Sequence, residues 1–432
     1  MTEIAEQPSW LEVAPSWRKE ALLLVPAVGI TLIGIYLLSG SEPDYLSGLR
    51  PWLKQSLFGA CGILLGLLIS RLPMTFFISI APACYVLNLA LILSLKWIGT
   101  ERGGAVSWID IGPFRFQPSE TMKIFTILIL AQFLCPLKSS VGFRSFLEAA
   151  LAAAVPAAFI LLQPDLGTAM VFVGILMACL HGSRVPRRYI SLLLIPLWAC
   201  VALPGEVLTW IIWGAGMALW LLMIAWKGES KTRLALFLVA HVLTVALVVQ
   251  GVKPLWNHLL KPHQRDRLVG FIERTDSDTR DLSPAAYHLR QSLIAISSGG
   301  FLGQGLGQGF QSSHGFIPMM RTDFIFSVLA EELGFAGAMI LFGLIILLFL
   351  ESIHHASHAD TWRESTVVFG VMGMWAAHTF VNLGMTMGLM PITGIPFPFL
   401  SYGGSSLITN YLGLGLILSA ARRSRVKVEQ AF

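Results

Sequence analysis

Long apolar stretches, separated by short polar segments, follow one another along most of the chain. Runs such as ALLLVPAVGITLIGIYLL do not alternate apolar and polar residues, as the strands of a membrane β-barrel do. An apolar run of about 20 residues is long enough to cross the hydrocarbon of a bilayer as a helix. The pattern therefore predicts an all-α polytopic membrane protein, a helical bundle that forms a single integral membrane domain over residues 1–432.

The apolar stretches predict about twelve membrane spans, with a long polar segment after the ninth. The predicted spans are 21–39, 53–70, 75–96, 120–135, 147–162, 166–181, 190–204, 207–226, 234–250, 324–350, 367–388 and 402–420. The first span has no small-residue cleavage site after it, so we expect a retained helix and not a signal peptide.

Composition supports a membrane protein and excludes other classes. Apolar residues make up 55% of the 432 and charged residues 13%, against about 25% charged in soluble domains; the mean hydropathy is +0.70. The five cysteines show no disulfide or metal-ligand spacing, so no metal site is predicted. The net charge of +5 suits an anionic inner leaflet, and nothing indicates a nucleic-acid partner.

Basic residues in the short loops predict the orientation, because such residues gather on the cytoplasmic side. They alternate from one junction to the next and also flank the first and last spans; the basic residues of the even-numbered junctions are Arg71, Lys138, Arg144, Arg184, Arg187, Arg188, Lys227, Lys231, Arg233 and Arg363. Both termini are therefore predicted to be cytoplasmic. Residues 98–119 and the long loop 251–323 then face outward.

The outward loop 251–323 gathers both acids and bases. RTDSDTRDLSPAAYHLRQSLIAISSGG contains Asp276, Asp278 and Asp281 beside several arginines. Arginine clamps phosphate oxygens, so the basic groups suit a phosphate-bearing ligand; contact with lipid headgroups explains their charge equally well. In the same loop, GGFLGQGLGQG at 299–309 is expected to form a tight re-entrant turn and not a dinucleotide site.

Charges also enter the predicted spans near the outer surface. Glu331 and Glu332 lie roughly 10–12 Å into the tenth span, at 1.5 Å per residue. Glu120 and Lys123 lie near the outer end of the fourth span, on neighbouring positions of one helix face. Charges at that depth are paired or face water. Two readings stay open: a buried Lys–Glu pair that fixes packing, or a polar cavity open to the outer surface.

Several motifs resemble the SEDS family, which contains RodA, FtsW and a sporulation protein of the same type. The resemblance rests on QPSETMK (117–123), QPDLGTA (163–169), YHLRQSLIAISSGGFLGQGLGQG (287–309), FIPMMRTDFIFSVLAEELGFAG (316–337) and MGLMPITGIPFPFLSYGGSS (387–406). The last motif is most similar to the RodA branch. The family typically has ten spans, so residues 190–226 are expected to form an extra hairpin.

The resemblance implies a peptidoglycan glycosyltransferase that polymerises lipid II on the outer face of the bacterial cytoplasmic (inner) membrane and releases undecaprenyl pyrophosphate. It implies a class B penicillin-binding protein as partner. An essential aspartate precedes a Tyr–Gln–Ser pattern by six residues in such proteins, which points to Asp281 ahead of Tyr287, Gln291 and Ser292. We expect Asp281 to act as the general base of an inverting transfer.

Further site residues follow from the same motifs. The residues expected to contact substrate are Gln117, Glu120, Lys123, Tyr287, Gln291, Arg321, Glu331, Ser401 and Gly403. Fixed cations stabilise a departing diphosphate, a task for Lys123 and Arg321 that a divalent cation, Mg²⁺ or Mn²⁺, could share. The chain departs from the family pattern at Ser107, Leu282 and Arg321, which changes the charge around the predicted site.

Two other functions remain to be weighed against the transferase. A flippase for the lipid-linked precursor should show internal repeats and broken helices around a midplane site, and the chain has no convincing repeat. A non-catalytic scaffold for the penicillin-binding protein would not need Asp281. Loss of glycan synthesis on changing Asp281 separates the transferase from both.

Overall fold

The computed structural model describes residues 16–40, 49–102, 105–112, 114–136, 142–183, 185–186, 189–190, 239, 284–317 and 319–429. The predicted spans 207–226 and 234–250, nearly all of 190–204, the extra hairpin 190–226 and the catalytic candidate Asp281 lie outside these residues. The predicted number of spans is therefore not tested.

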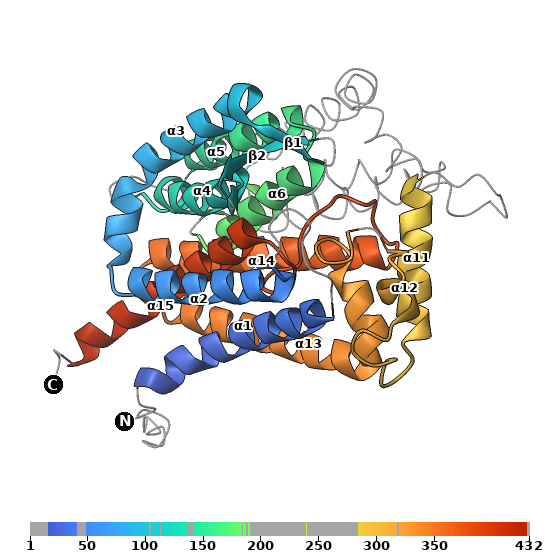
Figure 1. The fold of residues 1–432 in the computed structure, drawn as a ribbon. Helices are drawn as coiled ribbons and strands as arrows, with labels where there is room; N and C mark the ends of the chain where they lie inside the picture. Colours follow the sequence, from blue (N-terminus) through green and yellow to red (C-terminus); the bar gives the residue numbers. More distant parts are fainter. Residues whose placement is uncertain are drawn as a thin grey trace.

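The described chain is a bundle of apolar helices (Figure 1). In order they are α1 (Ser16–Ser39), α2 (Pro51–Ile69), α3 (Met74–Ile98), α4 (Pro118–Leu134), α5 (Phe143–Leu162), α6 (Leu166–His181), α11 (Pro284–Ser298), α12 (Phe310–Ser313), α13 (Ile325–Ser357), α14 (Trp362–Thr386) and α15 (Gly404–Glu429). Seven of them are long and apolar enough to cross a membrane, so the protein is a multi-pass membrane protein.

The helix bounds agree closely with the predicted spans wherever both are defined. The largest difference lies in α13, which runs to Ser357 and not to residue 350, so that its last two turns continue into a polar segment. The start of α1 and the end of α15 lie on the same side of the bundle (Figure 1), which agrees with the prediction that both termini share one side.

A small antiparallel sheet corrects the all-α prediction. It consists of β1 (Thr100–Arg102), β2 (Ala105–Ile111) and β3 (Phe114–Phe116), with β2 in the middle. Asp110 pairs with Arg115 across the last two strands, where their side chains lie 3.7 Å apart. The sheet joins α3 to α4 and therefore fixes where α4 begins.

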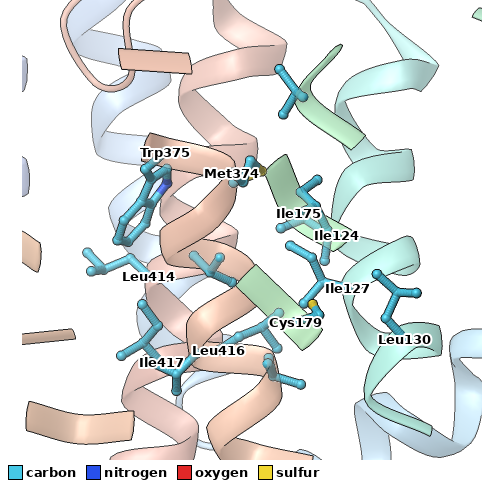
Figure 2. Close-up of a cluster of buried hydrophobic side chains, with 14 of the residues drawn as sticks. Ile124, Ile127, Leu130, Ile175, Cys179, Met374, Trp375, Leu414, Leu416 and Ile417 are labelled. Atoms are coloured by element: carbon cyan, nitrogen blue, oxygen red, sulfur yellow. The ribbon is translucent and has the colours of Figure 1, made fainter. Parts of the chain in front are cut away.

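The core lies where α4, α6, α14 and α15 meet (Figure 2). Its buried side chains include Ile124, Ile127, Leu130, Ile175, Cys179, Met374, Trp375, Leu414, Leu416 and Ile417. A second close contact joins α2 to α15 through glycines. A Cβ on Gly415 would lie 2.5 Å from the carbonyl oxygen of Gly66, so only glycine lets these two backbones approach so closely.

Helix α13 is broken at Gly334, whose φ of 64° and ψ of −163° leave the helical region. At the break, two amides and two carbonyls of α13 lose each other as partners, and the loop 299–305 replaces them. Phe335 and Ala336 donate to the carbonyls of Gly300 and Phe301 at 2.9 and 3.0 Å, and Gln304 and Gly305 donate to the carbonyls of Glu331 and Glu332 at 2.9 and 3.0 Å. The predicted re-entrant turn is confirmed and is inserted into a helix.

Helix α11 lies within the segment predicted as a loop, and this prediction is corrected. The helix packs against α13 and α14 at one end of the bundle (Figure 1). Ser292 is fully buried and fixes the contact: its hydroxyl lies 2.6 Å from the Ser327 hydroxyl and donates to the carbonyl of Thr386 at 2.7 Å. The described part of residues 251–323 is thus an ordered element that is anchored to two long helices.

Candidate active site

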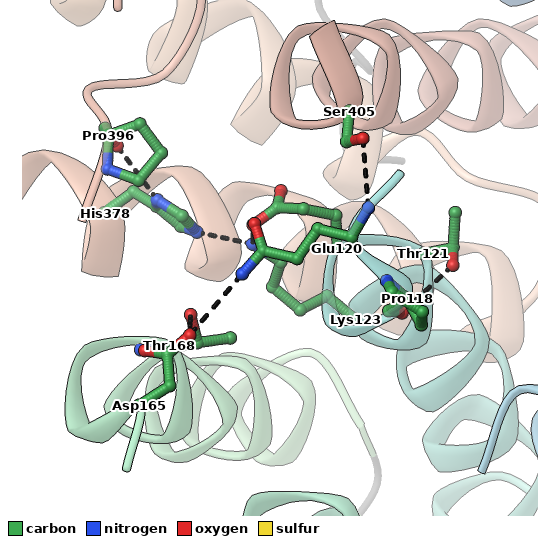
Figure 3. A network of polar contacts seen from close by, with 10 residues as sticks. Pro118, Glu120, Thr121, Lys123, Asp165, Thr168, His378, Pro396 and Ser405 are labelled. Atoms are coloured by element: carbon green, nitrogen blue, oxygen red, sulfur yellow. Dashed lines mark hydrogen bonds and ion pairs between the residues drawn. The ribbon is translucent and has the colours of Figure 1, made fainter. Parts of the chain in front are cut away.

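A buried polar network lies at the start of α4 (Figure 3). Pro118 begins the helix, because its fixed φ suits the first turn and it needs no hydrogen-bond acceptor there. Glu120 and Lys123 follow one turn apart, and the Lys123 ammonium lies 2.7 Å from the Glu120 carboxylate. Their side chains are only 3% and 1% exposed. The first reading of these charges, a buried Lys–Glu pair, is therefore confirmed, and both partners belong to α4.

His378 on α14 completes the network. Its Nε2 lies 2.8 Å from the Lys123 ammonium, and its Nδ1 lies 3.0 Å from the carbonyl oxygen of Pro396. The sequence suggested helix-to-helix hydrogen bonding for His378, and the bond between α14 and α4 confirms it. The sequence contained no sign that its partner is Lys123, since the two residues are far apart along the chain.

Gln117 connects this network to two neighbouring segments (Figure 3). Its side-chain amide donates to Asp165 at 3.4 Å, and its backbone N–H donates to the Ser405 hydroxyl at 3.2 Å. Asp165 caps α6, as expected, by accepting from the backbone N–H and the hydroxyl of Thr168 at 2.9 and 2.8 Å. Burial raises the pKa of the Asp165 carboxyl, although the bonds from Thr168 act in the opposite direction.

Arg321, Ser401 and Gly403 meet where the loop before α15 crosses the turn before α13. The Ser401 hydroxyl donates to the carbonyl of Thr322 at 2.6 Å, and the N–H of Tyr402 donates to the carbonyl of Arg321 at 2.9 Å. Gly403 donates its N–H to the Gln55 side chain at 3.4 Å. The structure brings these predicted residues together, and their described bonds are made within the protein.

Glu331 and Glu332 hold the re-entrant loop and do not join the Lys123 network. The carboxylate of Glu331 accepts from the backbone N–H groups of Gln311 and Ser312 at 2.7 and 3.0 Å. Glu332 accepts from the Ser312 hydroxyl at 3.2 Å. No hydrogen bond or ion pair of the described residues links either glutamate to Lys123 or Glu120, so the expected common cavity for all four charges is not formed by them.

A small pocket lies between the end of α1, the re-entrant loop and α13. Glu332 and Arg321 both line it, together with Gly40, Gly307 and Ser312. Its volume of about 30 Å³ leaves room for one water molecule. The pocket is too small for a sugar, so it does not by itself form a substrate site.

The remaining predicted contacts lie on α11. Tyr287 is 37% exposed and packs edge-to-face against His288; Gln291 lies one turn further along, half-buried. Asp281 precedes α11 in the sequence by three residues and lies outside the described part of the chain. Among the described residues, no three histidine, cysteine or acidic side chains converge on a metal position.

Comparisons with known proteins identify the family. The model of the cell cycle protein family of FtsW, RodA and SpoVE matches residues 19–213 and 198–426. The chain is 36% identical over 426 residues to the peptidoglycan glycosyltransferase RodA of Treponema pallidum, covering 93% of this chain and 97% of that one. It is 31% identical to the peptidoglycan glycosyltransferase MrdB of Escherichia coli K12, covering 83% and 82%.

Solved structures support the fold. One, described as "Structural coordination of polymerization and crosslinking by a peptidoglycan synthase complex", aligns with a TM-score of 0.66 at 27% identity, covering 95% of this chain and 99% of that one. RodA of Thermus thermophilus aligns with a TM-score of 0.60 at 24% identity, covering 96% and 98%, and this likeness concerns the fold alone. With the family model matching almost the whole chain, the protein belongs to the FtsW, RodA and SpoVE family of cell cycle proteins.

Proposed function

We propose that the protein is a peptidoglycan glycosyltransferase that polymerises lipid II into glycan strands and releases undecaprenyl pyrophosphate. The observation that carries the proposal is the 36% identity, over 97% of its length, to a RodA named for this activity. The proposed place of the reaction is the outer face of the cytoplasmic (inner) membrane, with both termini inside the cell.

The proposed chemistry is a single inverting displacement. A sugar hydroxyl of one chain attacks the anomeric carbon of the next, and the bond from that carbon to the diphosphate oxygen breaks. Asp281 takes the proton of the attacking hydroxyl, a contribution of about 10²–10⁴ in rate for a positioned base. The diphosphate leaves with the bonding electrons and gains negative charge, so a fixed cation stabilises the transition state more than the ground state.

Lys123 is the proposed cation for the leaving group. Its charge is held by Glu120 and His378 and lies beneath the segment that contains Ser405. Gln117, Arg321, Ser401, Gly403, Tyr287 and Gln291 are proposed to contact the substrate, and Glu331 to support the site through the re-entrant loop. A divalent cation, Mg²⁺ or Mn²⁺, is proposed to arrive on the diphosphate; chelation with EDTA during polymerisation tests this.

A class B penicillin-binding protein is the proposed partner. The solved relative belongs to a complex that both polymerises and crosslinks, and crosslinking is the task of a transpeptidase. Co-purification of this protein with the transpeptidase encoded in the same cell tests the pairing.

The flippase alternative gains one observation, because α13 is broken, as helices at transporter sites are. However, the four backbone groups released at Gly334 all bond to loop 299–305. No backbone group is therefore left there to bind a passenger, and the break supports the re-entrant loop instead.

Glycan synthesis from lipid II by the purified protein tests the proposal. The wild type is expected to make polymer and Asp281→Asn to make none, because an amide cannot accept the proton, while both proteins unfold at the same temperature. Equal polymer yield from the two would remove Asp281 from the mechanism. A wild type without activity, alone and with its transpeptidase, would favour the scaffold.

A further inference from the structure

His378 bonds two different segments with its two ring nitrogens (Figure 3). The side chain is 3% exposed. Nε2 faces the Lys123 ammonium and Nδ1 faces the Pro396 carbonyl. The imidazole therefore links α4, α14 and the loop that leads to α15 through Ser401.

These partners fix the protonation of the ring. An ammonium group has only donors, so Nε2 must offer a lone pair, and a carbonyl only accepts, so Nδ1 must carry the hydrogen. The neutral Nδ1–H tautomer satisfies both contacts. A protonated ring would turn an N–H toward the ammonium and set two cations 2.8 Å apart, with only Glu120 and, beyond Gln117, Asp165 as nearby acids.

The Lys123 ammonium has one more donor than the network uses. It carries three N–H groups, and its described partners are Glu120 and His378. The side chain is 1% exposed, so water does not serve the third N–H freely. A buried charged donor without a partner is costly; within the described part of the chain, this one awaits an acceptor from elsewhere.

We infer that His378 is a positioning residue that holds the Lys123 ammonium so that its third N–H meets a diphosphate oxygen of the lipid-linked donor. The inference rests on the proposed function. Glu120 neutralises the charge of Lys123, while His378 restricts its direction without adding charge. The loop containing Pro396 thereby becomes coupled to the position of the cation.

The variants His378→Leu and His378→Gln test the role, with Thr386→Val as a control. Leucine removes the acceptor, whereas glutamine can accept from Lys123 and donate to Pro396. Thr386 is a fully buried polar residue on the same helix, and its hydroxyl bonds only carbonyls of its own helix. The probe is undecaprenyl pyrophosphate, whose dissociation constant is measured with the full chain in lipid nanodiscs.

His378→Leu is expected to weaken binding of the probe about tenfold or more, as for loss of a hydrogen bond to a charged group. His378→Gln and Thr386→Val are expected to bind within a factor of about two to three of the wild type. In a Lys123→Met background, His378→Leu should cause no further loss, because it acts through Lys123. A purely structural role would instead give losses that add.

Three results would overturn the inference: equal binding by wild type and folded His378→Leu, additive losses in the Lys123→Met background, or the other tautomer. The ¹⁵N shifts of the wild-type imidazole, assigned by difference from His378→Gln, report the tautomer even if His378→Leu does not fold. A wild type that binds the probe but makes no glycan would refute the proposed function and leave the positioning result to be judged on binding.

Discussion

Replacing Gly334 by alanine should release the re-entrant loop from α13. The φ of 64° and ψ of −163° at this residue lie in a region essentially restricted to glycine, and strain of this kind costs about 1–3 kcal/mol. A Cβ would also lie 2.3 Å from the backbone nitrogen of Gly303. Since that neighbour is backbone and not a flexible side-chain end, the loop itself must shift.

The shift weakens the four hydrogen bonds that join loop and helix. At about 1 kcal/mol for each bond, loss of half of them together with the strain gives a destabilisation of about 3–5 kcal/mol. Glu331 accepts from Gln311 and Ser312 in the same loop, so these contacts should loosen too. The free energy of unfolding, measured by SDS titration in mixed micelles, gives the difference.

Gly343→Ala is the matched control, because it makes the same change in the same helix. A Cβ there meets no atom within 4 Å, so the variant should be as stable as the wild type or more stable by about 0.4–1 kcal/mol. Faster hydrogen exchange at Gln304 and Gly305 in Gly334→Ala alone would locate the effect. Equal stability of the two variants would show that the break does not depend on glycine.

Three further variants test contacts of the site in the same unfolding assay. Lys123→Met should cost about 3–5 kcal/mol because it leaves the Glu120 carboxylate buried without its cation, and adding Glu120→Gln should recover part of the loss; no recovery would mean that the lysine stem, not the charge, matters. Ser292→Ala should cost about 1–3 kcal/mol, since it leaves partners on α13 and α14 unpaired, whereas Ser297→Ala on the exposed face of α11 should change little. Asp165→Asn should flatten the pH dependence of stability: with the folded pKa raised, stability is highest below the unfolded pKa and falls as pH rises through the folded pKa, and an unchanged profile would contradict this.

The spanning helices could be predicted because each is encoded within its own segment. Apolar length alone placed α1, α2, α3 and α14 to within a few residues. Pro118 and Asp165 marked the starts of α4 and α6 for local reasons, one through its fixed φ and the other through its cap. The small sheet was missed, because its strands have only three to seven residues and lie in a segment treated as a loop.

Helix α11 and the partners within the site could not be predicted in the same way. Helix α11 is not apolar enough to be counted as a span, and it is held by long-range contacts such as that of Ser292 with Thr386. The motifs selected Lys123 but not its partner His378, and similar depth suggested Glu331, which in fact bonds the re-entrant loop. Depth along a helix does not determine which neighbour a side chain faces.

The order of synthesis gains meaning from the loop that fills the break in α13. Residues 299–305 precede α13 in the chain, so the ribosome has already delivered the substitute partners when Gly334 emerges. Lipid offers no water to bond a bare amide or carbonyl. The chain therefore never needs to expose the broken helix alone, and a circular permutant that synthesised the loop last would have to insert α13 with four backbone groups unsatisfied.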